Sequence, residues 1–265
     1  MKSPIFALSF LLLGTAFAEP SNYPVFTSVL GQPNFSSSAP ISPTASSLNN
    51  PESMAIDPTT GKLFVADYGN HRVLRFSSTA AYQTGAAAEI VLGQIAFNEN
   101  SSGRSATKFN EPVSVFVDAE GRLWVTDHRN QRILRFDNAS SIETGAPANA
   151  VIGQPDFDSD VDAGTPATSK FEGPAGIFVT KSGTLWVADE DDHRILRFDN
   201  AASLNGEVDA DQVVGQPDLS TSVANTERNG LYTPWGIWID TSGNLYVGDY
   251  SNNRVLRFDD IESAG

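Results

Sequence analysis

Short apolar runs separated by turn residues fill this chain. In residues 174–220 the runs PAGIFVT, LWVAD, HRILRF and DQVVGQPDL are interrupted by Lys181-Ser182-Gly183, by Glu190-Asp191-Asp192 and by a longer loop. Short runs rich in β-branched and aromatic residues, with turn residues between them, are typical of strands. No stretch combines the 3.6-residue period of a helix with helix caps. The pattern therefore predicts a unit of four antiparallel strands.

The same unit occurs four times. Its most regular segments are ADYGNHRVLRF (66–76), TDHRNQRILRF (126–136), ADEDDHRILRF (188–198) and GDYSNNRVLRF (248–258). The first aspartates of these segments are 60, 62 and 60 residues apart, and a Gly-Gln pair at 31–32, 93–94, 153–154 and 215–216 keeps nearly the same period. A fixed period of this length indicates one supersecondary unit copied along an array.

Equivalent positions of the four copies indicate how the units are arranged. The second strand carries an aromatic column, and the first strand carries a column of small residues: Phe64, Trp124, Trp186 and Tyr246, and Ser53, Ser114, Gly176 and Gly236. Small residues suit a crowded axis, and units that are apolar on both faces need a neighbour on each side. We therefore predict an all-β fold, a β-propeller of four-stranded antiparallel blades near 51–97, 112–157, 174–219 and 234–265, the last blade being incomplete.

The beginning of the chain resembles the strand that the last blade lacks. Residues 25–35 read VFTSVLGQPNF, which matches VVGQPDL in the third copy. We expect this segment to supply the outer strand of the last blade, because joining the two ends of the chain in one blade removes an exposed edge. A second interpretation stays open, in which the chain is a fragment of a larger ring whose missing blades lie between its ends.

Two further columns have a structural explanation. Each repeat places an aspartate five residues before an arginine: Asp67 and Arg72, Asp127 and Arg132, Asp189 and Arg194, Asp249 and Arg254. Such a pair can fix the turn between two strands by bidentate contact, and we interpret all four pairs as architecture. The histidines His71 and His193 share their column with Gln131 and Asn253, which indicates a polar turn position rather than a metal ligand or a general base.

These segments resemble the NHL repeat, whose extended pattern is similar to YVADSGNHRIQVF. The resemblance extends over nearly all of residues 19–265, and the block around VLGQPDF is similar to that of secreted, bacterial-type members. The triplet that names the family is altered here to Asn70-His71-Arg72 and its equivalents. The resemblance implies a propeller, usually of about six blades. It does not imply one function, because propellers serve both as binding modules and as enzymes.

Residues 1–18 have the pattern of a signal peptide. Lys2 precedes an apolar run from Ile5 to Leu13, and Ala16-Phe17-Ala18 is a small-residue cleavage site. The run is too short to span a bilayer. We therefore predict a secreted protein, extracellular or periplasmic, with residues 19–265 as the propeller and no membrane span. The chain contains no cysteine, so it forms no disulfides.

The charge of the chain disfavours one class of partner. The sequence has 32 Asp and Glu against 17 Lys and Arg, a formal net charge of −15, and removal of residues 1–18 with Lys2 makes this −16. Proteins that bind nucleic acid rely on Lys and Arg contacts to phosphates. We therefore predict no nucleic-acid partner.

The candidate binding residues lie on one face of the predicted ring. The links between blades, 36–50, 98–111, 158–173 and 220–233, differ far more than the strands do, and variable loops on a rigid frame commonly bind ligands. Trp235 stands where the other copies have Glu52, Val113 and Ala175, so it can be a ligand anchor or a plug of the axis. The predicted ligand-binding residues are Trp235, Tyr232, Glu52, His128, Tyr68 and Tyr250.

No catalytic residue, metal site or cofactor is predicted. Alternating aspartates at 156, 158, 160 and 162 lack the glycine and glutamate spacing of a calcium loop, so we interpret them as a solvated acidic loop. We expect a non-enzymatic scaffold that binds a protein or a carbohydrate (glycan) through its loop face. The alternative is a metal-dependent enzyme similar to propeller lyases or lactonases, which would need histidines or carboxylates around the axis.

Overall fold

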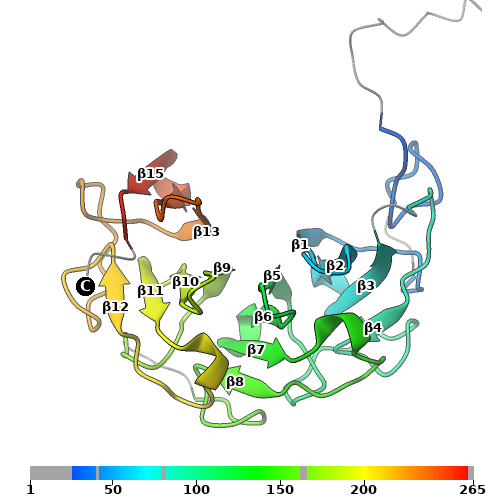
Figure 1. The fold of residues 1–265 in the computed structure, drawn as a ribbon, viewed down its shortest axis with the longest axis horizontal. Coiled ribbons are helices and arrows are strands. Elements are labelled where there is room, and N and C mark those ends of the chain that lie inside the picture. The colour runs from blue at the N-terminus through cyan, green and yellow to red at the C-terminus, as the bar shows by residue number, and fades with distance from the viewer. Residues whose placement is uncertain (1–25, 40–41, 79–81, 162–165, 262–265) are drawn as a thin grey trace, which may run out of the picture.

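The computed structural model describes residues 26–39, 42–78, 82–161 and 166–261, so the predicted signal peptide lies outside the described residues. Four antiparallel sheets stand like blades around a common centre (Figure 1). The predicted all-β propeller is therefore confirmed, and the described residues contain no α-helix. No helix in these ranges is long and apolar enough to cross a membrane.

Each blade is built from consecutive strands. Blade 1 comprises β1 (Pro51–Ile56), β2 (Lys62–Asp67), β3 (Arg72–Ser78) and β4 (Ile90–Leu92). Blade 2 comprises β5 (Pro112–Val117), β6 (Leu123–Asp127), β7 (Arg132–Phe136) and β8 (Ala150–Ile152). Blade 3 comprises β9 (Pro174–Val179), β10 (Leu185–Asp189), β11 (Arg194–Phe198) and β12 (Gln212–Val214). Blade 4 comprises β13 (Pro234–Ile239), β14 (Leu245–Asp249) and β15 (Arg254–Phe258).

Short 3-10 turns join some of these strands. Between the second and third strands lie η1 (Tyr68–Asn70), η3 (His128–Asn130) and η6 (Tyr250–Asn252), and after the third strands of blades 2 and 3 lie η4 (Ala139–Ser141) and η5 (Ala201–Ser203). The first strand of each blade is innermost, and contacts run from β1 to β5, from β5 to β9 and from β9 to β13 (Figure 1). The turns between second and third strands and the links between blades form the loop face.

Three of the four hydrophobic clusters lie between neighbouring blades, and the fourth is formed by blade 1 with the segments that flank it. Phe64 of blade 1 belongs to a cluster with Val117 of blade 2, and Trp124 of blade 2 belongs to one with Val179 of blade 3. The next member of this aromatic column, Trp186, packs in the same way against blade 4. Each blade therefore depends on its neighbour for the burial of its large side chains, which is the physical reason for the radial arrangement.

The four predicted Asp–Arg pairs are present, and in blades 1, 2 and 3 both side chains are buried, whereas Arg254 of blade 4 is partly exposed. In blade 2 the Arg132 Nε donates to Asp127 Oδ2 at 2.7 Å, and neither side chain is exposed. The other guanidinium nitrogens donate to main-chain carbonyls, among them those of Ser105 and Lys108 in the preceding link at 2.9 and 3.0 Å. Asp127 Oδ1 accepts the main-chain N–H of Asn110 at 2.6 Å. The pair thus holds the turn and the interblade link together, and loss of one partner would leave a buried charge at a cost of about 3–5 kcal/mol.

Residues 26–35, which were predicted to complete the last blade, lie beside the first blade in the described part of the chain. The sheet of blade 4 has three strands, and residues 26–35 lie against blade 1 instead. The Val29 N–H donates to Thr84 Oγ1 at 3.4 Å, and Val29 O accepts the N–H of Gly85 at 3.0 Å. Blades 1 and 4 stand at opposite ends of an open arc, so a segment held on blade 1 lies far from β15 (Figure 1).

Blade 3 departs from the other copies at one buried position. In blades 1, 2 and 4 an asparagine amide donates to the buried aspartate, as Asn130 Nδ2 does to Asp127 Oδ2 at 2.8 Å. Blade 3 has Asp192 there, and its carboxylate contacts Arg194 at 3.0 Å. Burial, together with the charge of Asp189, raises the pKa of Asp192 to about 7. Ionised Asp192 therefore destabilises the fold.

Replacement of Asp192 by asparagine should remove a pH dependence of stability. A carboxyl whose pKa rises from 3.8 unfolded to about 7 folded holds its proton more tightly in the native state, so stability falls as pH rises from about 4 to about 7. We expect Asp192→Asn to raise the free energy of unfolding at pH 8 by about 1.5–3 kcal/mol, with a smaller effect near pH 4. Urea titrations at a series of pH values between about 4 and 8 measure the free energy of unfolding. The reverse change, Asn130→Asp, should create the same dependence in blade 2. A pH dependence that is unchanged in Asp192→Asn, or no new dependence in Asn130→Asp, would contradict the assignment.

The small-residue column gives a second, matched pair of variants. A Cβ added at Gly176 would lie 2.5 Å from the Trp235 carbonyl oxygen, whereas one added at Gly236 would meet nothing within 4 Å. We expect Gly176→Ala to destabilise the protein by about 1–3 kcal/mol, because the backbones of β9 and β13 would have to separate. Gly236→Ala should change stability by less than about 1 kcal/mol. Thermal and urea unfolding compare the two, and equal effects would show that the close approach does not matter.

Candidate binding site at the central pocket

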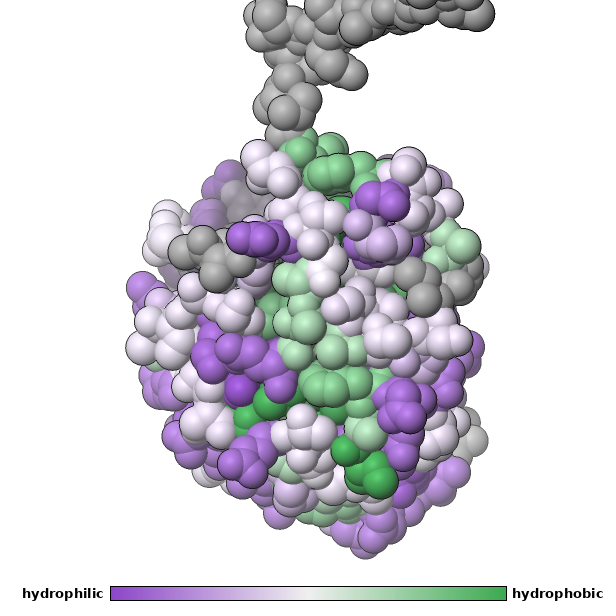
Figure 2. Space-filling view, turned by 90° about the vertical axis from the view of Figure 1, so that its right-hand side faces the viewer, coloured by the Kyte–Doolittle hydropathy of each residue, from purple (hydrophilic) through white to green (hydrophobic). Residues whose placement is uncertain are grey.

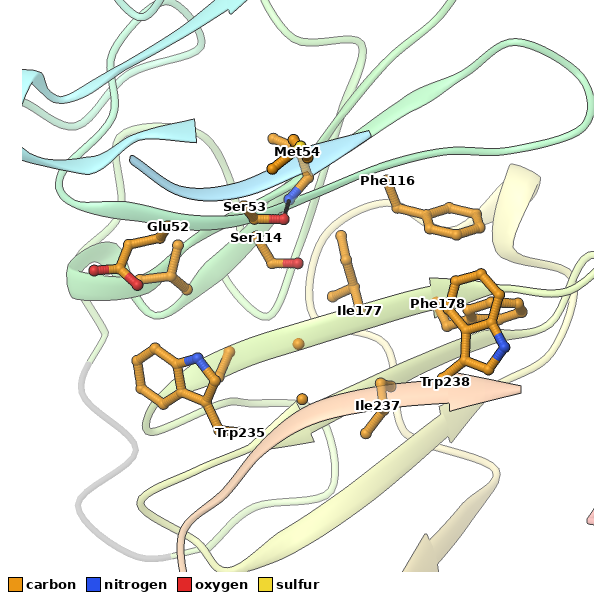
Figure 3. A pocket seen from close by; sticks show the side chains of 15 residues that line it. Glu52, Ser53, Met54, Ser114, Phe116, Ile177, Phe178, Trp235, Ile237 and Trp238 are labelled. Atoms are coloured by element: carbon orange, nitrogen blue, oxygen red, sulfur yellow. Dashed lines mark hydrogen bonds between the residues drawn. The ribbon is translucent and has the colours of Figure 1, made fainter. Parts of the chain in front are cut away.

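All four innermost strands line one central pocket of about 270 Å³. The predicted column of small residues, Ser53, Ser114, Gly176 and Gly236, lines this pocket, and Ser53 and Ser114 lie near its middle (Figure 3). The Ser53 hydroxyl accepts the N–H of Val115 at 3.3 Å and so ties β1 to β5 across the pocket wall. A pocket just below the usual range for ligand sites, about 300–1,000 Å³, can hold a side chain or a single sugar, but not a large cofactor.

The two ends of the pocket differ in chemistry. Glu52 and Trp235 lie across from each other at one end, and Met54, Phe116 and Trp238 lie toward the other (Figure 3). Phe116 and Trp238 belong to an aromatic series in which Phe178 is 4.9 Å from Phe116 and 5.2 Å from Trp238 between ring centroids. The same three aromatic residues line a second hollow of about 420 Å³ with the loops after β5, β9 and β13. The polar end, by contrast, opens on the loop face.

Trp235 is not a buried plug. It is 37% exposed, whereas its equivalents Val113 and Ala175 are buried. Its ring centroid is 6.2 Å from that of His128, whose Nδ1 lies 3.2 Å from the Pro174 carbonyl oxygen. Trp235 also lines a third hollow of about 460 Å³ together with Tyr250. An aromatic side chain shared by two hollows can contact a ligand in either.

A polar cluster joins the turn of blade 1 to the link before blade 2. Tyr68 donates to Glu111 Oε2 at 2.6 Å, and Arg129 Nε donates to the same oxygen at 2.9 Å. Hydrogen bonding to Glu111, more than burial, raises the pKa of Tyr68. Burial opposes ionisation of Glu111, but the two donors together hold the pKa of its carboxyl below the usual value. Tyr68 is therefore fixed in place by its partners.

The histidines of the repeat have the structural role that their column suggests. The N–H of Glu111 donates to His71 Nδ1 at 3.1 Å, and that of Thr233 donates to His193 Nδ1 at 3.3 Å. Each ring thus ties the turn of one blade to the link that enters the next. Tyr232 packs edge-on against His193 at 5.2 Å between centroids, so it belongs to the junction of blades 3 and 4.

The predicted binding residues therefore fall into separate groups. Trp235, Glu52 and His128 gather at the mouth of the central pocket. Tyr250 faces the third hollow, and Tyr68 and Tyr232 belong to interblade junctions. Sequence reasoning did not identify Arg129. Its signal was a positive charge at a position where the other copies have Gly69, Asp191 and Ser251.

The described residues contain no group of three or more His, Cys, Asp or Glu side chains that could hold a metal ion. In the acidic loop, Asp156 Oδ1 accepts the N–H groups of Asp158 and Ser159 at 3.0 and 2.8 Å, and Asp160 pairs with Arg104 at 2.5 Å. Asp162 lies outside the described residues. The carboxylates that are described here thus have partners within the protein or face solvent.

Comparison with known sequences identifies the repeat. The family model described as "NHL repeat" matches residues 48–76, 109–136, 171–198 and 231–258. Protein SUPPRESSOR OF QUENCHING 1, chloroplastic, of Arabidopsis thaliana is 22% identical over 225 residues, which are 82% of this chain and 20% of that protein. NHL repeat-containing protein 3 of Mus musculus is 30% identical over 101 residues, which are 37% of this chain and 25% of that protein. The chain thus spans a quarter or less of these relatives.

Solved structures share the fold at low sequence identity. An auxiliary nutrient binding protein from Bacteroides thetaiotaomicron VPI-5482 superposes with a TM-score of 0.52 at 16% identity, over 79% of this chain and 47% of that chain. One from Bacteroides ovatus ATCC 8483 gives a TM-score of 0.51 at 14% identity, over 80% and 49%. The chain covers about half of each neighbour, and the likeness is one of fold. With four matched repeats, each containing the three inner strands of one blade, the chain belongs to the NHL-repeat family of β-propeller proteins.

Proposed function

We propose that the protein is a secreted, non-catalytic scaffold that binds a protein or a carbohydrate at the mouth of its central pocket. The observation that carries the proposal is the position of Trp235, which is partly exposed, faces Glu52 and lies between two hollows. Tryptophan buries a large area on contact and is enriched among residues that dominate binding energy. Glu52 supplies a hydrogen-bond acceptor beside it, a combination that suits a sugar hydroxyl or a peptide N–H.

The proposal draws limited support from the structural neighbours. Two of them are described as nutrient binding proteins, and they share the arrangement of blades with this chain. No observation on the described residues favours the metal-dependent lyase or lactonase alternative, which would need several donor side chains directed at one point. The strongly acidic composition also disfavours nucleic acid as the ligand.

Replacement of Trp235 should strongly weaken ligand binding without unfolding the protein. We expect Trp235→Ala to lower the affinity for a ligand by at least about 30-fold. Because Trp235 is partly exposed, the melting temperature should change little. Arrays of oligosaccharides and peptides, followed by tryptophan fluorescence titration of each hit, measure the affinity. Trp238→Ala is the matched control, since Trp238 lies at the other end of the pocket and should leave binding intact.

Two outcomes would contradict this assignment. If Trp235→Ala binds every hit as the parent protein does, the anchor is elsewhere. If the variant instead loses roughly 3–5 kcal/mol of stability, Trp235 behaves as a core residue and its effect on binding follows from unfolding.

A further inference from the structure

The second hollow, of about 420 Å³, lies at the end of the arc opposite the loop face, beside the hairpins that join the first and second strands of the blades. Its volume is within the usual range for small-molecule sites, about 300–1,000 Å³. Phe116, Phe178 and Trp238 form an aromatic wall and lie close together (Figure 3). Phe116 and Phe178 belong to blades 2 and 3, which have a neighbour on each side, so their positions do not depend on either end of the arc.

One lysine at the rim of this hollow has no partner among the described residues. Lys181 is exposed and lines the hollow, and its ammonium group makes no ion pair or hydrogen bond within the part of the chain that the structure describes. The other lysines of the described residues are each held by a side chain: Lys62 by Glu89 at 3.0 Å, Lys108 by Gln94 at 2.8 Å and Lys170 by Glu207 at 3.3 Å. A cation beside an aromatic wall is therefore available to a ligand.

The hairpin of blade 3 differs in charge from the other three. Lys181 stands where the other copies have uncharged residues, which line the same hollow: Pro58, Ala119 and Thr241. At the preceding position the other copies have an acid: Asp57, Asp118 and Asp240. Blade 3 has Thr180 there, and its hydroxyl shares a hydrogen bond of 2.6 Å with that of Ser182. Residues 180–184 thus carry one positive charge and no negative charge, in a protein of net charge −15.

The carboxylate of Asp240 also lines the second hollow, but its own hairpin occupies it. Its Oδ1 accepts the main-chain N–H groups of Ser242 and Asn244 at 2.8 and 3.0 Å. Its Oδ2 accepts the Asn244 amide at 2.9 Å and the Tyr246 hydroxyl at 3.1 Å. Both oxygens are therefore engaged within blade 4, and no ion pair joins Asp240 to Lys181 in the described residues.

An apolar surface on the outer side of blade 1, by contrast, is already used by the fold. On the side of the molecule that carries blade 1, an apolar band runs between hydrophilic margins (Figure 2). Leu30 and Leu48, from the segments that flank this blade, pack against its cluster with Leu74 and Val91. The outer side of blade 1 thus has a cover within the chain, whereas no described segment fills the second hollow.

We propose that the second hollow binds a small organic acid with an aromatic body, whose rings pack against Phe116 and Phe178 and whose anionic group pairs with Lys181. Aromatic rings prefer tilted and edge-on contacts, and the wall already contains both, since Phe178 is inclined by 46° to Phe116 and by 77° to Trp238. The apolar stem of a lysine can lie along such a wall while its ammonium group reaches the acid. The site is separate from the mouth of the central pocket, which opens on the loop face.

Two fluorescent probes separate the role of the charge from that of the rings. Anilinonaphthalene sulfonate has an aromatic body and one anionic group, and phenylnaphthylamine has the same rings without the sulfonate. Titration of the full chain with each probe measures its affinity. We expect Lys181→Met to lower the affinity for the sulfonate by about tenfold, because a hydrogen-bonded charge is lost, and to leave the affinity for the neutral probe unchanged. Arg228→Met is the matched control, since Arg228 is an exposed cation on the loop face with no partner among the described residues, and it should bind both probes as the parent protein does.

A second variant tests the hollow itself. Ala119 is exposed and lines it, so Ala119→Trp should place a ring inside the hollow and lower the affinity for both probes by at least about tenfold. The melting temperature should change little, because the substituted side chain is exposed. Thr59→Trp is the matched control, since Thr59 is exposed on the hairpin of blade 1 but does not line the hollow, and it should leave both affinities unchanged.

Three results would overturn the proposal. The first is a parent protein that binds neither probe. The second is a Lys181→Met variant that binds the sulfonate as the parent does or loses both probes equally, since the lysine would then not select an anion. The third is an Ala119→Trp variant that binds both probes as the parent does, which would show that they bind elsewhere.

The function proposed for the central pocket is tested separately. Trp235 lines the central pocket and the third hollow but not the second, so Trp235→Ala should bind both probes as the parent protein does. A loss of both probes in this variant would place them in the central pocket. That result would overturn the second site and leave the proposed role of Trp235 standing.

Discussion

The fold depends on one interaction, the buried ion pair between the aspartate that ends the second strand and the arginine that starts the third. A bare pair of this kind would cost more in desolvation than it returns. Here the guanidinium also donates to carbonyl groups of the link that enters the blade, and the carboxylate accepts a main-chain N–H from the same link. The pair therefore supplies hydrogen-bond partners to a loop that has no sheet to provide them. Its repetition fixes the loop face in every blade.

A rigid loop face is what allows the mouth of the pocket to carry a binding site. The glycine of each Gly-Gln pair lies under an apolar side chain of the next link, as Gly93 does under Phe109 and Gly215 under Leu231. Two of the glutamines reach back to the preceding turn: Gln94 Nε2 donates to the His71 carbonyl at 3.1 Å, and Gln216 Nε2 donates to the His193 carbonyl at 2.9 Å. Variable residues such as Trp235 can thus differ between repeats without disturbing the frame that holds them.

The repeat made much of this architecture predictable, because a column of four residues reveals a shared environment. The Asp–Arg pairs, the small inner positions and the structural role of His71 and His193 all follow from columns. Features that belong to one copy were harder to predict. The contact of Arg129 with Glu111 joins two loops across a junction, and the exposure of Trp235 depends on how far the arc extends. For residues 26–35, sequence similarity identified an outer-strand segment but did not identify the blade beside which it lies in the structure.

Each blade holds the outer strand of the blade before it. This contact limits how the number of repeats in such a chain can change. Gly145 and Gly206 hold Val91 and Val151 across sheet boundaries, so a cut between two sheets also separates hydrogen-bonded partners. Duplication or deletion preserves every contact only when its two breakpoints fall at the same position in different repeats. Insertions of 60 or 62 residues, beginning anywhere in the repeat, are therefore the changes in length that the architecture accepts.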